Sequence, residues 1–408
     1  MGRVAVIGGG ASGMIAAIRA SENNEVVLFE KNEKLGKKIY ITGKGRCNVT
    51  NDCEKEEFLH SVVSNPKFLM SALNNFTPQD LMNFLETNGL TLKVERGNRV
   101  FPLSDKASDV TAVFAKKMKE CGVDVRLNEK VDEISVLDGS VNGVKTEKGF
   151  IPFDKVIVCT GGKSYPSTGS TGDGYRFAEK AGHTVVTPVP SLVGLNLKGD
   201  DFKSCQGLSL KNVEVSVFRG EKKIFSDFGE MLFTHFGISG PIVLSSSCVL
   251  CRERLSDIKV VIDLKPALTK EKLDERLLRD FEANSNKNFI NVLPSLVPKS
   301  LNELIIRRTG ISANRKINGI TAAERAKIVS ALKELTFSLA SLRPFEEAIV
   351  TSGGVSVKEV NPKTMESKLV KGLYFAGEVL DVDAFTGGFN LQIAFSTGVA
   401  AGEGACRD

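Results

Sequence analysis

The first thirty residues alternate between apolar runs and a glycine-rich turn. Residues 4–7 (VAVI) form a short β run, and residues 8–13 (GGGASG) form the turn. Residues 14–20 are helical in composition, and a second apolar run at 25–30 (EVVLFE) ends in an acidic residue. This order of strand, tight turn, helix and strand predicts the βαβ unit that opens a parallel sheet.

The pattern from residue 100 to residue 162 predicts further elements of an α/β fold. Ser104 or Asp105 is a candidate cap for a helix that runs to about Cys121. The other elements predicted there are a strand at 123–127, a hairpin of 131–137 and 141–146 around an Asp138-Gly139 turn, and a buried strand at 155–159 that ends in Thr160, Gly161 and Gly162.

The pattern of hydrophobic and polar residues changes at about residue 188. Alternating strands such as 213–218 follow, and residues 266–334 then become helical. The helices predicted there are 270–283, 301–308 and one from Thr321, where Thr-Ala-Ala-Glu is a capping box. Strand texture returns near 345. The domains predicted are a discontinuous one at 1–189 and 350–408, a β-rich insert at 190–265 and 335–349, and a helical insert at 266–334.

The turn at residues 8–13 has the chemistry of a dinucleotide site. It fits G-x-G-x-x-G, follows a strand, opens a helix, and precedes a strand ending in Glu30, 22 residues after Gly8. The glycines let the backbone approach a pyrophosphate, which sits on the helix N-terminus. Glu30 would accept hydrogen bonds from ribose hydroxyls and would repel a 2′-phosphate. FAD or NAD is therefore favoured over NADP, and a glycine-rich helix start near 386–393 favours FAD.

Length and composition narrow the class of protein. The 408 residues suit two or three domains, and the eight scattered cysteines are typical of a reduced, cytoplasmic chain rather than a disulfide scaffold. We expect no signal peptide, because Arg3 is followed directly by the apolar β run at residues 4–7. The longest uncharged run, residues 231–251, contains glycine, proline and serines, so a buried loop and helix are expected there and no membrane partner.

The distribution of charge is more informative than the net charge of +5. Residues 266–334 hold 13 Lys/Arg and 8 Asp/Glu, which equals the surplus of the whole chain. A solvated helical face is the favoured interpretation, because aromatic residues are not interleaved with the basic ones as in nucleic-acid surfaces. We therefore expect a small-molecule substrate and no nucleic-acid partner, and the sequence carries no signal for an oligomeric state.

Four further segments together resemble a known family. They are 43–51 (GKGRCNVTN), 233–241 (FTHFGISGP), 350–355 (VTSGGV) and 377–392 (GEVLDVDAFTGGFNLQ). With the N-terminal turn, they are similar to bacterial NAD(P)/FAD-dependent oxidoreductases, a family that includes aminoacetone oxidase and flavoenzymes that reduce 3-dehydro-bile-acid enones. The resemblance implies an α/β fold: a glutathione-reductase-like Rossmann FAD domain with an inserted β domain and a small helical domain.

The resemblance also implies roles for individual residues. On the adenosine side, the pyrophosphate would be held by Gly8, Gly10, Ala11, Ser12 and Gly13, the ribose by Glu30 with Lys31 beside it, and adenine by the Val131 backbone. Glu378 would meet the ribityl or phosphate region. The middle and flavin end would be lined by Arg46, Cys47 and Asn48, and the flavin pyrimidine edge would meet N–H groups of Asn390, Leu391 and Gln392, beyond Gly388. Gly161 and Gly162 belong to a T-G-G…T-G-D-G stretch that either follows the cofactor or only permits a tight turn. Ala384 departs from the glycine expected in the C-terminal loop.

Candidates for acid–base and thiol chemistry are few. His235 and Tyr165 are the candidate proton donors, although a structural role is the stronger interpretation for His235. Cys47 and Cys53 are spaced C-x5-C, and Cys248 and Cys251 C-x-x-C; packing is favoured for both pairs. No metal site is predicted.

The function predicted is that of an FAD-dependent oxidoreductase which passes a hydride through flavin N5 to or from a small organic substrate. Reduction of a conjugated, steroid-like enone, with NAD(P)H as a transient electron donor, is one version. Oxidation of a small amine or aminoketone is the second. An RNA-modifying flavoprotein, a thiol–disulfide reductase and a non-catalytic flavin sensor remain alternatives from other classes.

Overall fold

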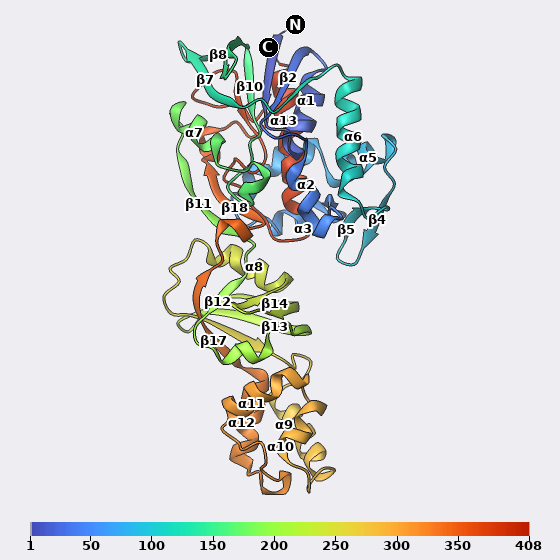
Figure 1. Ribbon diagram of the computed structural model, residues 1–408, viewed down its shortest axis with the longest axis vertical. Helices are drawn as coiled ribbons and strands as arrows, with labels where there is room; N and C mark the ends of the chain where they lie inside the picture. Colours follow the sequence, from blue (N-terminus) through green and yellow to red (C-terminus); the bar gives the residue numbers. More distant parts are fainter. Residues whose placement is uncertain (1, 408) are drawn as a thin grey trace. The chain divides into compact units, whose positions relative to one another are not determined.

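The computed structural model describes residues 2–407 and separates into two compact units (Figure 1). One unit contains the chain up to Ser191 and again from Pro344, and the other is Leu192–Arg343. Each unit has its own hydrophobic core. The helical segment 266–334 shares the core of the second unit with the β-strands there.

A five-stranded parallel sheet organises the first unit. Its order is β19-β10-β1-β2-β6, and every neighbouring pair is parallel. The strands are β1 (Gly2–Ile7), β2 (Asn24–Glu30), β6 (Asp124–Leu127), β10 (Lys155–Val158) and β19 (Leu373–Phe375). Residues 4–7 and 156–158 are buried without alternation, as expected for strands covered on both faces. The α/β fold with a parallel sheet is therefore confirmed.

Two helices from opposite ends of the chain pack together on this sheet (Figure 1). They are α1 (Ala11–Ala20) and α13 (Phe389–Ala405). A Cβ on Gly398 of α13 would lie 2.5 Å from Ser12 O, and one on Gly402 would lie 2.6 Å from Ala16 O. Only glycine permits this approach, so the two helix backbones are in close contact.

Shorter elements complete the first unit. Its antiparallel sheets are β3 (Thr50–Asn51), β5 (Arg99–Pro102) and β4 (Leu92–Glu95); β7 (Val131–Leu137), β8 (Ser140–Thr146) and β9 (Gly149–Pro152); and β11 (Val185–Ser191) with β18 (Val350–Val355). Its other helices are α2 (Lys37–Ile41), α3 (Lys55–His60), α4 (Pro66–Asn75), α5 (Pro78–Thr87), α6 (Ala107–Glu120) and α7 (Asp173–Lys180). The predicted hairpin is present, with positive φ at Asp138 and Gly139 as its turn requires.

The second unit is a closed six-stranded barrel with helices. The barrel order is β12-β15-β14-β13-β16-β17. The strands are β12 (Leu195–Leu197), β13 (Ser209–Arg219), β14 (Lys222–Phe233), β15 (Gly237–Ser239), β16 (Ile258–Asp263) and β17 (Leu335–Leu342), and the helices are α8 (Pro241–Leu250), α9 (Lys270–Glu282), α10 (Phe289–Val292), α11 (Asn302–Thr309) and α12 (Ala322–Lys333). The capping box predicted at Thr321 forms with Glu324.

One predicted boundary was wrong. Helix α6 begins at Ala107, and Lys106 precedes it in the cap position without a side-chain cap bond, in place of Ser104 or Asp105. Asp105 has a positive φ of 56°, and its carboxylate accepts hydrogen bonds from Arg46 and Lys93. The Asp105 carboxylate is therefore bound in ion pairs with Arg46 and Lys93 instead of capping the helix.

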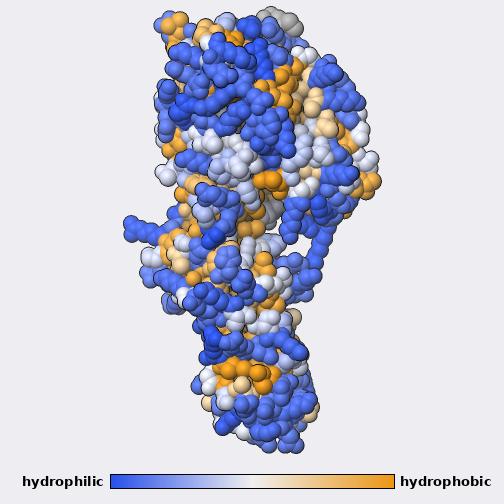
Figure 2. Space-filling view, in the orientation of Figure 1, coloured by the Kyte–Doolittle hydropathy of each residue, from blue (hydrophilic) through white to orange (hydrophobic). Residues whose placement is uncertain are grey.

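The surface view is largely polar, with apolar residues in small separate groups (Figure 2). Among residues 2–407, no helix combines the length and apolar character needed to cross a bilayer.

Candidate functional site

The glycine turn after β1 combines tight packing with open space. A Cβ on Gly13 would lie 1.8 Å from Gly8 O, and one on Gly8, whose φ is 107°, would lie 2.5 Å from Cys159 O. These two glycines therefore hold the turn against the start of α1 and the end of β10. A Cβ on Gly10, by contrast, would have no heavy atom within 4 Å among the described residues. The turn thus leaves room beside Gly10, directly before the helix.

The N-terminus of α1 is suited to an anion. Gly10 is its N-cap, and within residues 2–407 no side chain caps it. The first N–H bonded inside the helix is that of Met14, to Gly10 O, so the N–H groups of residues 11–13 lie outside the helical bonding pattern. The helix dipole adds positive potential there. Thr160 follows β10, and its buried Oγ1 has no hydrogen-bond partner in the described chain.

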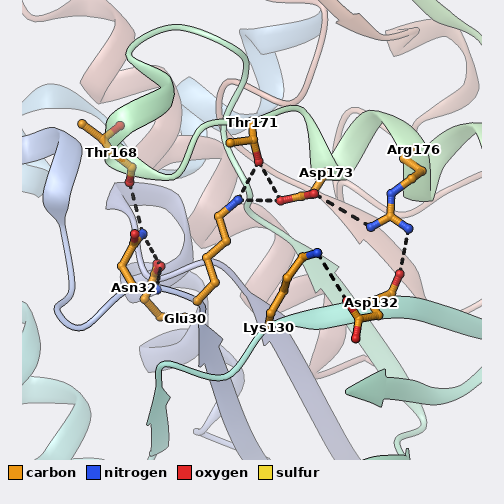
Figure 3. Close-up of polar contacts among 9 residues, drawn as sticks. Glu30, Asn32, Lys130, Asp132, Thr168, Thr171, Asp173 and Arg176 are labelled. Carbon is orange, nitrogen blue, oxygen red and sulfur yellow. Dashed lines mark hydrogen bonds and ion pairs between the residues drawn. The ribbon is translucent and has the colours of Figure 1, made fainter. Parts of the chain in front are cut away.

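Glu30, at the end of β2, is fixed by three N–H donors, and Figure 3 shows its contact with Asn32. Oε2 accepts from Gly9 N at 2.8 Å. Oε1 accepts from the backbone N and the side-chain Nδ2 of Asn32, at 2.8 and 2.6 Å. The carboxylate therefore lies beside the glycine turn in one orientation. Val131 belongs to the same neighbourhood, because Glu129 N donates to Glu30 O just before β7.

Lys31 points to a different element from Glu30. Its Nζ lies 2.6 Å from both Thr171 Oγ1 and Asp173 Oδ2, at the start of α7 (Figure 3). Burial alone would raise the pKa of Asp173, but the hydrogen bonds from Lys31 and Thr171 hold it below its ordinary value. Lys31 and Asp173 are therefore a charged, half-buried pair.

Glu378, after β19, is the centre of a second polar cluster. Its Oε2 accepts from Lys38 Nζ at 2.5 Å, and its Oε1 accepts from Ser164 Oγ at 2.6 Å and Thr351 N at 2.7 Å. A Cβ on Gly162 would lie 3.0 Å from Glu378 Oε1. The structure thus brings together Glu378 and the Gly161-Gly162 turn, which the sequence placed far apart.

The N-terminus of α13 is the second helix start in this unit. Gly388, its N-cap, has a φ of 103°, and a Cβ there would lie 2.3 Å from Thr50 O. Asn51 Nδ2 donates to Gly387 O at 3.0 Å. The GRCNVTN and TGGFNLQ segments, which carried the family resemblance, are therefore in direct contact.

In the first turn of α13, some backbone N–H groups are already hydrogen-bonded within the helix and others are available to a ligand. Gln392 N already donates to Gly388 O, whereas the N–H groups of Asn390 and Leu391 precede the first intrahelical bond. The Gln392 side chain is fully buried and contacts Thr50 Oγ1 and Phe76 O. The Asn390 side chain closes the preceding loop, through hydrogen bonds in both directions with the Ala384 backbone.

The GRCN residues lie around the strand β5. The Arg46 guanidinium stacks on the Phe101 ring and is bound by Asp105 and Glu95. Cys47 is fully buried with a φ of 59°, and Asn48 Oδ1 accepts from Val100 N. Their own protein contacts orient all three side chains.

The candidate proton donors lie in different units. Tyr165 is half-buried in the first unit, with a φ of 49° and its backbone N donating to Phe345 O. His235 is exposed in the loop between β14 and β15 of the second unit, edge-on to Phe236. Both roles stay predictions.

Cys47 and Cys53 do not have the electrostatics of reactive thiols. Burial raises the pKa of Cys47 to about 12 and that of Cys53 to about 11. Cys248 and Cys251 are in and directly after α8. No cluster of three metal-ligating side chains is found within residues 2–407.

Sequence reasoning missed several residues that organise the site. Asn32 and Lys38 carry no motif, and their partners Thr168 and Ser164 lie more than a hundred residues away. Thr171 and Asp173 were inside the T-G-D-G segment, so that motif was the available signal for them.

The residues present fit FAD. The first unit offers space beside Gly10, two uncapped helix starts and a fixed carboxylate at the end of β2, a strand of the parallel sheet. A dinucleotide binds at the carboxyl edge of such a sheet, with one phosphate group at a helix N-terminus. The α13 N-terminus would stabilise negative charge at the flavin end.

Comparison with known proteins identifies the family of this chain. The family model described as HI0933-like protein Rossmann domain matches residues 2–404. The chain is 32% identical to the 3-dehydro-bile acid delta(4,6)-reductase of Clostridium scindens, covering 100% of both chains. It is 30% identical to the ribosomal RNA dihydrouridine synthase of Haemophilus influenzae, covering 97% of this chain and 96% of that one.

A solved structure shares the fold at low identity. The 3-ketosteroid-delta4-(5alpha)-dehydrogenase of Rhodococcus jostii RHA1 is 13% identical, with a TM-score of 0.54 over 99% of this chain and 96% of that one. The predicted flavoprotein fold is confirmed. The chain belongs to the HI0933-like Rossmann family and is an FAD-dependent oxidoreductase.

Proposed function

We propose that this protein reduces a carbon–carbon double bond conjugated to a carbonyl group. The observation that carries the proposal is the full-length similarity, at 32% and 30% identity, to two proteins whose names imply this bond. A 3-dehydro bile acid with Δ4,6 unsaturation has its double bonds conjugated to the 3-oxo group. Uridine has its C5–C6 double bond conjugated to the C4 carbonyl, and dihydrouridine lacks it. The two substrates differ in size and share the reacting group.

The residues described above would divide the work. FAD, when bound, supplies the hydride that is added to the β carbon of the conjugated bond. The glycine turn and Glu30 would hold the adenosine and pyrophosphate half, while Glu378 and the N-terminus of α13 would orient the flavin half. NAD(P)H is the proposed donor that restores the reduced cofactor.

Protonation of the α carbon completes the reduction and requires an acid. Tyr165 and His235 are the proposed donors. Replacing the true donor, as Tyr165→Phe or His235→Asn, would slow product formation about a hundredfold or more and leave flavin reduction by NAD(P)H unchanged. If both variants retain the wild-type rate, neither residue is the acid.

A steroid-like enone is the substrate that we favour, because the relative with that substrate is the one matched over the whole of both chains. Charge supports uridine in RNA as a second candidate. The unit Leu192–Arg343 contains 24 Lys/Arg and 17 Asp/Glu, while the rest of the chain contains 30 and 32. An RNA substrate is attracted by such a surplus, which a steroid does not need.

Anaerobic stopped-flow absorbance near 450 nm tests both candidates. The FAD-loaded protein is first bleached with NADH or NADPH, and then mixed with a 4,6-dien-3-one steroid or with an unmodified ribosomal RNA fragment. Rapid return of the flavin colour with one of them identifies the substrate class. Return with neither, in the presence of full bleaching, would contradict the reduction of conjugated double bonds.

A further inference from the structure

A loop in the first unit spans the carboxyl edge of the parallel sheet. It consists of residues 161–173 and begins after β10, the neighbour of β1 in the sheet. Its residues Thr168 and Thr171 contact Asn32 and Lys31, which follow β2, the neighbour of β1 on the other side. Because β1 lies between β10 and β2, the loop bridges the end of β1, which carries the glycine turn. We call residues 161–173 the bridging loop.

The bridging loop is fastened at both ends. Near its start, Thr351 Oγ1 accepts hydrogen bonds from Lys163 N and Ser164 N at 2.8 and 3.0 Å. Near its end, Lys31 bonds to both Thr171 and Asp173 at 2.6 Å. Figure 3 shows the second fastening together with the Asn32 Nδ2 bond to Thr168 O.

The loop is a compact piece of chain. Gly172 N donates to Gly162 O, so its two ends are close together, as in an Ω-loop. Gly161, Gly169 and Gly172 all have a positive φ. A Cβ on Gly169 would lie 2.5 Å from Asn32 Nδ2, so the loop sits directly on the residue that fixes Glu30.

We propose that the bridging loop is a clasp over the adenosine and pyrophosphate half of FAD, held shut by the Lys31–Asp173 ion pair. Exchange of the cofactor then requires the clasp to open. The clasp makes FAD a resident group that stays bound through many turnovers. This inference rests on the proposed FAD chemistry, since it assigns a gate to that same site.

Exchange of adenine-labelled FAD against an excess of unlabelled FAD tests the clasp. The variants are Lys31→Gln, Asp173→Asn and the double variant. Each single change removes the same ion pair, so each would speed release about tenfold. The double variant would release at the rate of Asp173→Asn, because that change alone already removes both ion pairs of Asp173, with Lys31 and with Arg176. Lys116→Gln is the matched control, since Lys116 pairs with Glu120 on the exposed face of α6, outside the loop.

The Asp173→Asn variant separates a clasp from direct attraction of the phosphates by Lys31. Removing a negative charge would slow release, or leave it unchanged, if Lys31 only attracted the pyrophosphate. The clasp predicts faster release and also faster association, since an open loop eases entry as well as exit. Circular dichroism melting shows whether each variant is folded. Wild-type exchange rates in Asp173→Asn would overturn the clasp alone, whereas a wild-type protein that binds no FAD would overturn the clasp and the proposed function together.

Discussion

Replacing Gly10 by alanine separates the needs of the cofactor from those of the fold. Gly10 has φ −83° and ψ −168°, which alanine adopts without strain, and its added Cβ would have no heavy atom within 4 Å among residues 2–407. The folded protein without FAD therefore has space for the methyl group. The pyrophosphate expected at the start of α1 would have to share that space.

The expected free-energy changes are larger for FAD binding than for the stability of the FAD-free protein. Gly→Ala at a compatible site stabilises by about 0.4–1 kcal/mol, and alanine is weaker than glycine at an N-cap by about the same amount. The free energy of unfolding without FAD would then change by less than about 1 kcal/mol, a shift in Tm of no more than about 4 °C. Crowding of the ligand costs about 1–3 kcal/mol, which weakens FAD binding about 5- to 150-fold.

The assay is a fluorescence titration of the FAD-free protein, with thermal melting measured on the same samples. Gly13→Ala is the comparison, because its Cβ would lie 1.8 Å from the backbone atom Gly8 O. That variant would lose both FAD binding and several degrees of Tm. Wild-type FAD affinity in Gly10→Ala would refute the placement of the pyrophosphate beside Gly10.

Three further outcomes follow from the site. Glu30→Gln would weaken FAD binding about tenfold in the same titration. The three groups around the Glu30 carboxylate are all N–H donors, and the new amide NH2 would face one of them. Unchanged affinity would exclude a role for the negative charge of Glu30. Cys47→Ser would keep turnover above half of wild type, since a thiol with a pKa of about 12 is not a thiolate at neutral pH; loss of turnover, measured as NAD(P)H consumption, would restore the thiol–disulfide alternative. His183→Gln would flatten the fall in Tm as the pH drops from 7 to about 5. Burial lowers the pKa of His183 below its ordinary 6.5, so the unfolded chain binds the proton first and stability is lost as the pH falls through that range; identical melting curves across that pH range would show that His183 is not responsible.

Features that depend on neighbouring residues could be predicted from the sequence. The glycine turn, the strand ending in Glu30 and the Thr321 capping box each rest on contacts within a short stretch, and each has the predicted form. The family resemblance assigned residues of GRCNVTN and TGGFNLQ to the flavin end of the cofactor, and the structure shows these segments in contact, which no local pattern predicts.

Features that depend on distant partners could not be predicted. The bond of Asn32 to Thr168 and the cluster of Lys38 with Glu378 join segments without any shared period or spacing. The closed barrel was hidden for a different reason. Its strands β12 and β15 are three residues long, too short to give an alternating pattern.

The packing of α13 against α1 sets an order of events during protein synthesis. The ribosome makes α1 and its glycine turn first, and makes α13 only after nearly all of the chain in between. Until then Ser12 and Ala16 lack the glycine surface that covers them, and the second helix start of the site does not exist. On this view a nascent chain would have no complete place for the cofactor, FAD would be loaded after translation, and chains cut short before α13 would be left empty and open to proteolysis.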